Sequence, residues 1–341
     1  FYAGRILFTL RDAWEVAGRT FPEGALLAID AAAFRESGEL PSIETVYTPD
    51  DRTSIEGVTV SRSGLYVSLL QNVKGSILRF GVEAKSGEWR AELLPLPPSG
   101  TVSLSAANPH SGTVFINYED HITPDRLSEY DAGANALTRL KALPARFRAD
   151  GLQVSQHTVR SADGETVPYF VIHRKGLKPD GSTPTILYGY GGFEISLKPS
   201  YSATIGKLWL ERGGAYAVAN IRGGGEFGPR WHKAALKTNR QRAYDDFIAV
   251  AEDLAKRGIT SPKRLGISGG SNGGLLVGAC MTQRPDLFGA CIADVGVLDM
   301  LRFHKFTIGW AWTSDFGSPE NADEFEALLA YSPYHLPLKH T

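Results

Sequence analysis

The sequence has few cysteines, no long apolar run and no excess of charge of either sign. Only Cys280 and Cys291 occur among its 341 residues, so a disulfide framework is not expected to support the fold. No stretch reaches the roughly 18 consecutive apolar residues of a membrane span. The 36 basic residues nearly balance the 37 acidic ones, and they form no dense Lys/Arg run. Nucleic acid and membrane surfaces are therefore not expected as partners.

What is present is the composition of a globular protein, with 43% hydrophobic and 21% charged residues. The length favours two domains, because a single core rarely grows past about 250–300 residues. Position 1 is Phe rather than Met, so we expect the start of the parent protein to be missing and leave a signal peptide open. We expect a cytoplasmic protein, with the periplasm as the alternative for that reason.

The first half of the chain consists of short runs of β-branched and aromatic residues separated by turn residues, which predict antiparallel strands at 5–10, 58–60, 65–69 and 113–117. Similar strand ends recur at Asp30, Gly81 and Asp131, about 50 residues apart. Such a period is typical of β-propeller blades, each a small antiparallel sheet. We predict that residues 1–146 are the C-terminal blades of a propeller. The alternative is a β-sandwich in which the similar strand ends recur by chance.

Beyond about residue 150, strands alternate with helical periods, which predicts an α/β domain over 147–341 with a mostly parallel sheet. Thr185–Tyr188 and Ala215–Ile221 are near-continuous apolar runs, as expected of strands covered on both faces. An amphipathic helix is predicted from about Arg242 to a stop at Gly258. A short strand at 264–268, a glycine cluster and a small-residue helix at 273–282 follow.

The glycine cluster contains the pattern Gly-x-Ser-x-Gly twice, centred on Ser268 and on Ser271. In a nucleophile elbow the serine occupies a strained turn between a strand and a helix. Ser268 would still belong to the strand, whereas Ser271 leaves glycines for the turn and apolar residues for the helix. Ser271 is thus the better candidate nucleophile, and Asn272 would place its backbone N–H at the oxyanion. A glycine-rich packing turn without chemistry is the alternative.

Four segments, Tyr188–Phe193, Asn220–Glu226, Gly269–Gly274 and Ile308–Gly317, together resemble the catalytic domain of the prolyl oligopeptidase family. The resemblance extends to the β-rich half, since that family joins a β-propeller to an α/β-hydrolase domain. It implies a serine peptidase that cleaves short peptides after proline through an acyl-enzyme. It also implies proline-containing oligopeptides as substrates, a monomer, and no metal or organic cofactor.

The resemblance also implies roles for individual residues. Tyr190 matches the tyrosine whose hydroxyl joins the Asn272 N–H in the oxyanion hole. Trp312 matches the aromatic on which the substrate proline stacks, and the same apolar pocket would be closed by Phe193, Val297, Ile308 and Phe316. Each of these five pocket residues could equally be ordinary core.

Arg222–Glu226 lacks the spacing of a phosphate loop and is predicted to be a structural turn. Asp245 and Asp246 are predicted not to form a metal pair, and His232 and His304 are predicted to be packing histidines.

The base and the acid of a catalytic triad are not identified. Asp294, Asp299 and Asp315 do not match the position of the family acid, and His335 and His340 lack the glycine-flanked context of the family histidine. We therefore expect both partners beyond Thr341, and these 341 residues alone to be inactive. Two alternatives remain: an esterase or acylaminoacyl-type peptidase on the same scaffold, and a non-catalytic interaction protein.

Overall fold

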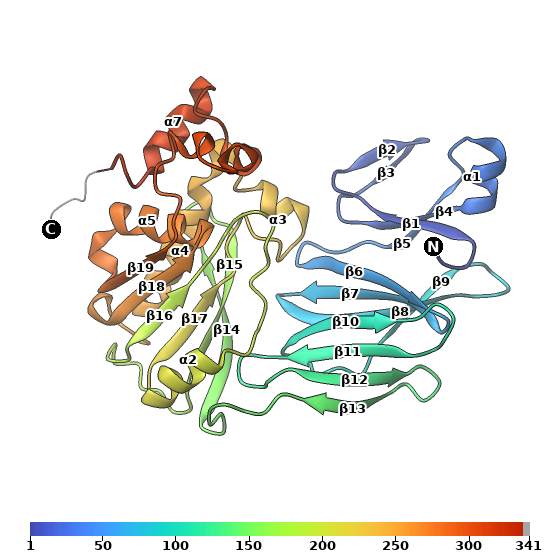
Figure 1. The fold of residues 1–341 in the computed structure, drawn as a ribbon, viewed down its shortest axis with the longest axis horizontal. Helices are drawn as coiled ribbons and strands as arrows, with labels where there is room; N and C mark the ends of the chain where they lie inside the picture. Colours follow the sequence, from blue (N-terminus) through green and yellow to red (C-terminus); the bar gives the residue numbers. More distant parts are fainter. Residues whose placement is uncertain (337–341) are drawn as a thin grey trace. The chain divides into compact units, whose positions relative to one another are not determined.

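The computed structural model describes residues 1–336 and divides into two compact units (Figure 1). Unit 1 consists of residues 1–144 with two short later segments, 198–201 and 226–230. Unit 2 contains the other described residues. In the described part of the chain, no helix is long and apolar enough to cross a membrane. Both cysteines are free thiols, Cys280 buried and Cys291 exposed.

Unit 1 is built from three successive antiparallel sheets. The first contains β1 (Arg5–Thr9), β4 (Leu26–Asp30) and β5 (Ile43–Tyr47), and carries the hairpin β2 (Trp14–Val16) and β3 (Arg19–Phe21) and the helix α1 (Ala31–Ser37). The second contains β6 (Thr53–Ser61), β7 (Gly64–Gln71), β8 (Lys74–Val82) and β9 (Trp89–Leu93). The third contains β10 (Thr101–Ala107), β11 (Val114–Glu119), β12 (Arg126–Asp131) and β13 (Ala136–Ala142).

The sequence period corresponds to equivalent strands of these sheets. Gly81 lies near the end of β8 and Asp131 ends β12, each the third strand of its sheet, while Asp30 ends β4 of the first sheet. Apolar side chains fill the space between successive sheets: Leu26 with Val67 between the first and second, and Tyr66 with Val114 between the second and third. Successive small sheets packed face to face are blades of a β-propeller. The propeller prediction is confirmed, and the sandwich alternative is wrong.

Unit 2 contains one six-stranded sheet in the order β14-β15-β17-β16-β18-β19. Its strands are β14 (Leu152–Arg160), β15 (Thr166–Arg174), β16 (Thr185–Tyr188), β17 (Ala215–Ala219), β18 (Leu265–Gly270) and β19 (Ala290–Asp294). The β17-β16-β18-β19 core is parallel, but β14 pairs with β15, and β15 with β17, in the antiparallel sense. The sheet is therefore mixed. Its antiparallel edge arises because the short turn between β14 and β15 can only return the chain antiparallel.

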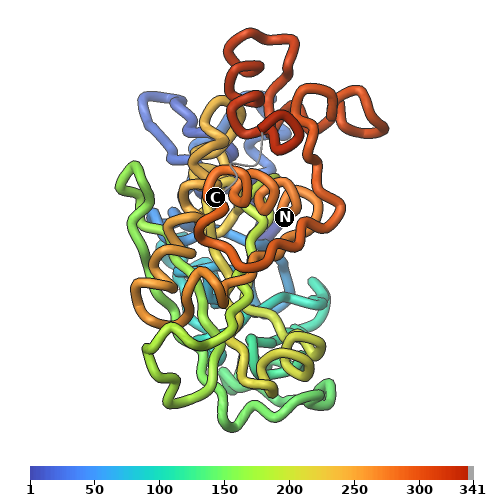
Figure 2. Tube along the Cα trace, turned by 90° about the vertical axis from the view of Figure 1, so that its left-hand side faces the viewer, coloured from blue at the N-terminus to red at the C-terminus, as the bar shows by residue number. Residues whose placement is uncertain are grey.

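Helices α2 (Ala203–Leu208), α3 (Pro229–Lys233), α4 (Gln241–Lys256) and α5 (Asn272–Gln283) connect the parallel strands, with 3-10 turns at Leu210–Arg212, Lys237–Asn239, Pro262–Arg264 and Pro285–Leu287. After β19 come α6 (Thr313–Phe316) and α7 (Ala322–Tyr331), with 3-10 turns at Phe303–Lys305 and Gly309–Trp312. The helix predicted from Arg242 is α4, and its apolar face is buried at Ala243, Phe247 and Leu254. The segment after β19 ends in α6 and α7, drawn in red in Figure 2.

Candidate active site

Ser271 lies in the turn between β18 and α5. Its backbone has φ 57° and ψ −115°, a sparsely populated positive-φ conformation that costs a non-glycine residue about 1–3 kcal/mol. The Ser271 N–H donates to the Asp294 carbonyl at 2.9 Å, and the Ser271 carbonyl accepts from the Gly274 N–H at 3.0 Å. The side chain is exposed. Ser268, the other candidate, lies inside β18, as the sequence predicted.

Glycines let the strand and the helix pass closely at this turn. A Cβ on Gly269 would lie 2.4 Å from the Gly273 carbonyl oxygen, and one on Gly274 would lie 2.5 Å from the Asp294 carbonyl oxygen. Both neighbours are backbone atoms, which cannot move aside as a flexible side chain can. The two glycines are therefore required by packing, and they fix how Ser271 is presented.

Tyr190 meets Ser271 from the loop that follows β16. The Tyr190 side chain interacts with the Ser271 side chain, and burial raises the pKa of Tyr190 above its ordinary value. The phenol therefore keeps its proton at neutral pH and can donate it to a developing negative charge. The Asn272 side-chain amide donates to the Tyr190 carbonyl at 2.6 Å, so the residue after the serine also holds the backbone of this tyrosine.

The predicted pocket residues are found in three segments of unit 2. Phe193 packs edge-on against Phe316 with ring centroids 5.3 Å apart. Phe316 is 1% exposed, so its ring supports Phe193 from the interior. Trp312 and Val297 are half-buried, whereas Ile308 is 56% exposed at the start of the 3-10 turn that contains Trp312. The structure thus joins Phe193 and Phe316 by direct contact. The roles of all five in binding stay predictions.

A buried polar cluster that the sequence did not predict lies behind these residues. The Asp315 carboxylate accepts from Arg240 Nη1 at 2.9 Å and from the Phe193 N–H at 3.0 Å, and it is bonded to His232 Nε2 at 2.9 Å. Arg240 Nη2 donates to the Asn272 side-chain oxygen at 2.5 Å. No sequence signal marks this cluster, because its members are far apart in the chain and Arg240 belongs to no motif. His232 has the structural partner expected of a packing histidine.

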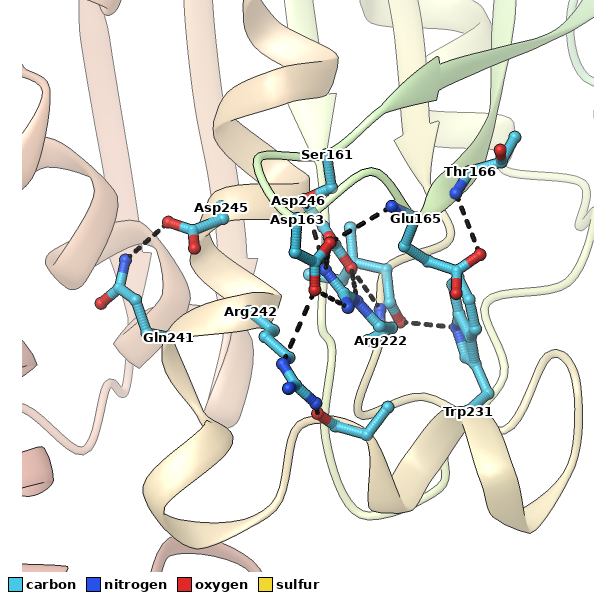
Figure 3. A network of polar contacts seen from close by, with 12 residues as sticks. Ser161, Asp163, Glu165, Thr166, Arg222, Trp231, Gln241, Arg242, Asp245 and Asp246 are labelled. Atoms are coloured by element: carbon cyan, nitrogen blue, oxygen red, sulfur yellow. Dashed lines mark hydrogen bonds and ion pairs between the residues drawn. The ribbon is translucent and has the colours of Figure 1, made fainter.

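A second, partly buried polar cluster holds the turn predicted at Arg222–Glu226 (Figure 3). Arg222 donates from Nε and Nη2 to the Asp246 carboxylate at 2.9 and 2.7 Å, and from Nη1 to Asp163 at 2.5 Å. Asp245 points elsewhere and accepts from Gln241 at 2.9 Å. The two adjacent carboxylates therefore have separate structural partners. No group of three His, Cys, Asp or Glu side chains within residues 1–336 could hold a metal ion.

These features define the class of protein. Unit 2 is an α/β-hydrolase domain with a serine at its strand–helix elbow, and unit 1 belongs to a β-propeller. The family model described as the prolyl oligopeptidase family matches residues 199–339, and the model of the N-terminal β-propeller domain of prolyl oligopeptidase matches residues 14–142. The chain belongs to the prolyl oligopeptidase family.

Relatives match both units. An uncharacterised peptidase of Sinorhizobium fredii is 45% identical over 98% of this chain and 46% of its own length. A prolyl endopeptidase of Elizabethkingia meningoseptica is 43% identical over 71% of this chain and 34% of its own. The solved structure of a post-proline cleaving enzyme from Rickettsia typhi matches with a TM-score of 0.91 at 33% identity, covering 99% of this chain and 49% of that one. The chain thus spans about half the length of these relatives, or less.

Proposed function

We propose that this chain is part of a serine peptidase that hydrolyses short peptides on the carboxyl side of proline. The observation that carries the proposal is the exposed Ser271 in a strained elbow, with the Tyr190 side chain interacting with it. The names of two relatives, a prolyl endopeptidase and a post-proline cleaving enzyme, support proline as the residue before the cleaved bond.

The chemistry follows from the two donors around the serine. The Ser271 oxygen attacks the carbonyl carbon of the peptide bond, and its proton passes to a general base. The resulting oxyanion accepts from the Tyr190 hydroxyl and from the Asn272 backbone N–H. The amine leaves with the proton that the base returns, and an ester remains on Ser271. Water, deprotonated by the same base, then hydrolyses the ester and frees the acid.

The base and its orienting acid are proposed to come from the sequence beyond Thr341. The described His232 and His335 are bonded to Asp315 and Ser332, respectively. His340 lies outside the described residues. Phe193, Phe316 and Trp312 are proposed to provide an apolar, aromatic wall, and Val297 and Ile308 to complete the pocket. A proline ring has no N–H and is rigid, so an aromatic face can select it without a hydrogen bond.

The test is hydrolysis of a short N-blocked Gly-Pro reporter by the full-length protein, its Ser271→Ala variant and its Ser268→Ala variant. We expect activity in the parent and in Ser268→Ala, and none above background in Ser271→Ala. Equal rates for the parent and Ser271→Ala would refute the assignment of Ser271. Ser268 is the matched control because it lies in the same glycine-rich segment and has the same Gly-x-Ser-x-Gly surroundings.

Other substrates and an active-site probe distinguish the proposed function from the esterase, acylaminoacyl-peptidase and non-catalytic alternatives. Turnover of N-acyl or ester substrates without a preference for proline would indicate an esterase or acylaminoacyl-type peptidase. A fluorophosphonate probe reports whether Ser271 is activated. We expect it to label the full-length protein and not the 341-residue chain, and failure to label either would indicate a non-catalytic protein.

A further inference from the structure

Three segments that are distant in sequence converge on one fully buried arginine. Arg240, which precedes α4, is 1% exposed. It bridges Asn272 in the first turn of α5 to Asp315 in α6. Through Asp315 it is also connected to the N–H of Phe193, and through Asn272 to the carbonyl of Tyr190. The loop after β16 is therefore linked to the Arg240 guanidinium at two points, once through Asp315 and once through Asn272.

The geometry leaves little freedom in this network. A guanidinium offers donors in a fixed planar fork, so Arg240 can satisfy Asp315 and Asn272 together only if both are correctly placed. The Arg240 Cζ atom also lies 5.1 Å from the centroid of the Phe316 ring. A Cβ on Gly192 would lie 2.8 Å from Arg240 Nη2 and 2.6 Å from Asn272 Nδ2, so the loop backbone packs directly on the bridge.

The loop that is held is conformationally strained. Phe193 has φ 54° and Glu194 has φ 57°, so two consecutive non-glycine residues are left-handed. Each left-handed residue is unfavourable by itself and persists only where neighbouring contacts enforce it. The Phe193 N–H is held by Asp315, and the Glu194 N–H donates to the Gly223 carbonyl at 3.1 Å. Without Asp315 the first of these two contacts is lost.

We propose that Arg240 and Asp315 are positioning residues that hold the Tyr190–Phe193 loop against the first turn of α5. The proposal rests on the proposed function, because it assigns these two residues to the alignment of its oxyanion donors. The Tyr190 hydroxyl and the Asn272 N–H come from different elements, and the Arg240 bridge fixes one relative to the other. Asn272 then has two roles: its backbone N–H donates to the oxyanion, while its side-chain oxygen accepts from Arg240.

The first experiment is a double-mutant cycle in the full-length protein, with the Gly-Pro reporter. Arg240→Lys keeps the positive charge but lacks the planar guanidinium that donates hydrogen bonds to Asp315 and Asn272 at the same time. We expect kcat to fall about tenfold or more, since misplacement of a catalytic group by about 1 Å can cost 10²-fold. In the Tyr190→Phe background, which has no hydroxyl to position, we expect the same change to cost less than about threefold.

Two further variants keep the test decisive if Arg240→Lys folds poorly. Asn272→Ala removes the side-chain bridge but keeps the backbone N–H, and we expect the same dependence on Tyr190. Asp253→Asn is the control. Asp253 accepts from Tyr169 and Arg257 near the other end of α4, roughly 20 Å along the helix from Arg240. We expect its kcat per active site to equal that of the parent.

Hydrogen exchange separates this inference from the proposed function. We expect the amides of residues 189–195 to exchange faster in Arg240→Lys than in the parent, and those of β17 to exchange equally. If the loop amides exchange faster in Arg240→Lys than in the parent, but the parent has no proline-specific activity, the positioning role is supported and the proposed function is refuted. An active parent whose Arg240→Lys variant keeps its kcat, or loses it equally with and without the Tyr190 hydroxyl, would overturn the positioning role.

Discussion

The Tyr190 hydroxyl is the side-chain donor that we propose for the oxyanion beside Ser271. Tyr190→Phe removes this proposed donor and leaves the ring in place. Losing one such donor typically lowers kcat by about 10²–10³. We expect a fall of this size for the Gly-Pro reporter in the full-length protein, with KM changed much less, because the donor acts mainly on the transition state. Steady-state kinetics measure it, and thermal unfolding at an unchanged midpoint is the control.

Burial gives the same residue a defined behaviour with pH. Because burial raises the pKa of Tyr190, the hydroxyl stays protonated through neutral and mildly alkaline pH. A loss of kcat caused by this residue should therefore appear only above about pH 10, the ordinary pKa of tyrosine. An alkaline limb near pH 8 that disappears in Tyr190→Phe would contradict the placement of this hydroxyl.

At the scale of elements, the close approach of β18 and α5 requires glycine. In an ordinary helix, replacing Gly by Ala stabilises by up to about 1 kcal/mol. At Gly274 the added Cβ would lie 2.5 Å from the Asp294 carbonyl oxygen and 2.7 Å from the Gly296 Cα. We expect Gly274→Ala to destabilise the α/β unit by about 1–3 kcal/mol instead, as overpacking does. Chemical denaturation followed by circular dichroism measures the change.

Gly151→Ala is the control for Gly274→Ala. Gly151 has no left-handed φ and no atom within 4 Å of a built Cβ. We expect its substitution to be neutral or slightly stabilising, through a less flexible unfolded chain. If Gly274→Ala were as well tolerated as Gly151→Ala, the elbow would not be packed as the structure describes.

At the scale of the whole molecule, one buried histidine couples stability to pH. Burial lowers the pKa of His121 in unit 1 to about 4, although Asp120 opposes the shift. Between about pH 6.5 and 4 the unfolded chain therefore binds a proton that the folded chain does not. Stability contributed by neutral His121 is present above about pH 6.5 and is lost as the pH falls toward 4, by about 3 kcal/mol.

His121→Asn removes this titration. We expect the unfolding free energy of the propeller unit to depend less steeply on pH between 4 and 6.5 in the variant than in the parent, whatever the offset at pH 7. Denaturation at a series of pH values, followed by a probe in unit 1, measures it. Parallel pH profiles for parent and variant would show that His121 is protonated equally in the folded and unfolded states.

The sequence by itself determined the two domain types, several of their strands and helices, and the strand–serine–helix turn at Ser271, because those features depend on local order along the chain. A repeat of about 50 residues predicted the blades, and the strand, glycines and helix around Ser271 predicted the elbow. Only the tertiary structure decided that β14 and β15 make the sheet mixed, and that Arg240 joins Asn272 to Asp315. The reason is physical: a buried bridge depends on which side chains folding brings together. Residues 32 and 75 positions apart leave no periodic pattern from which that contact can be predicted.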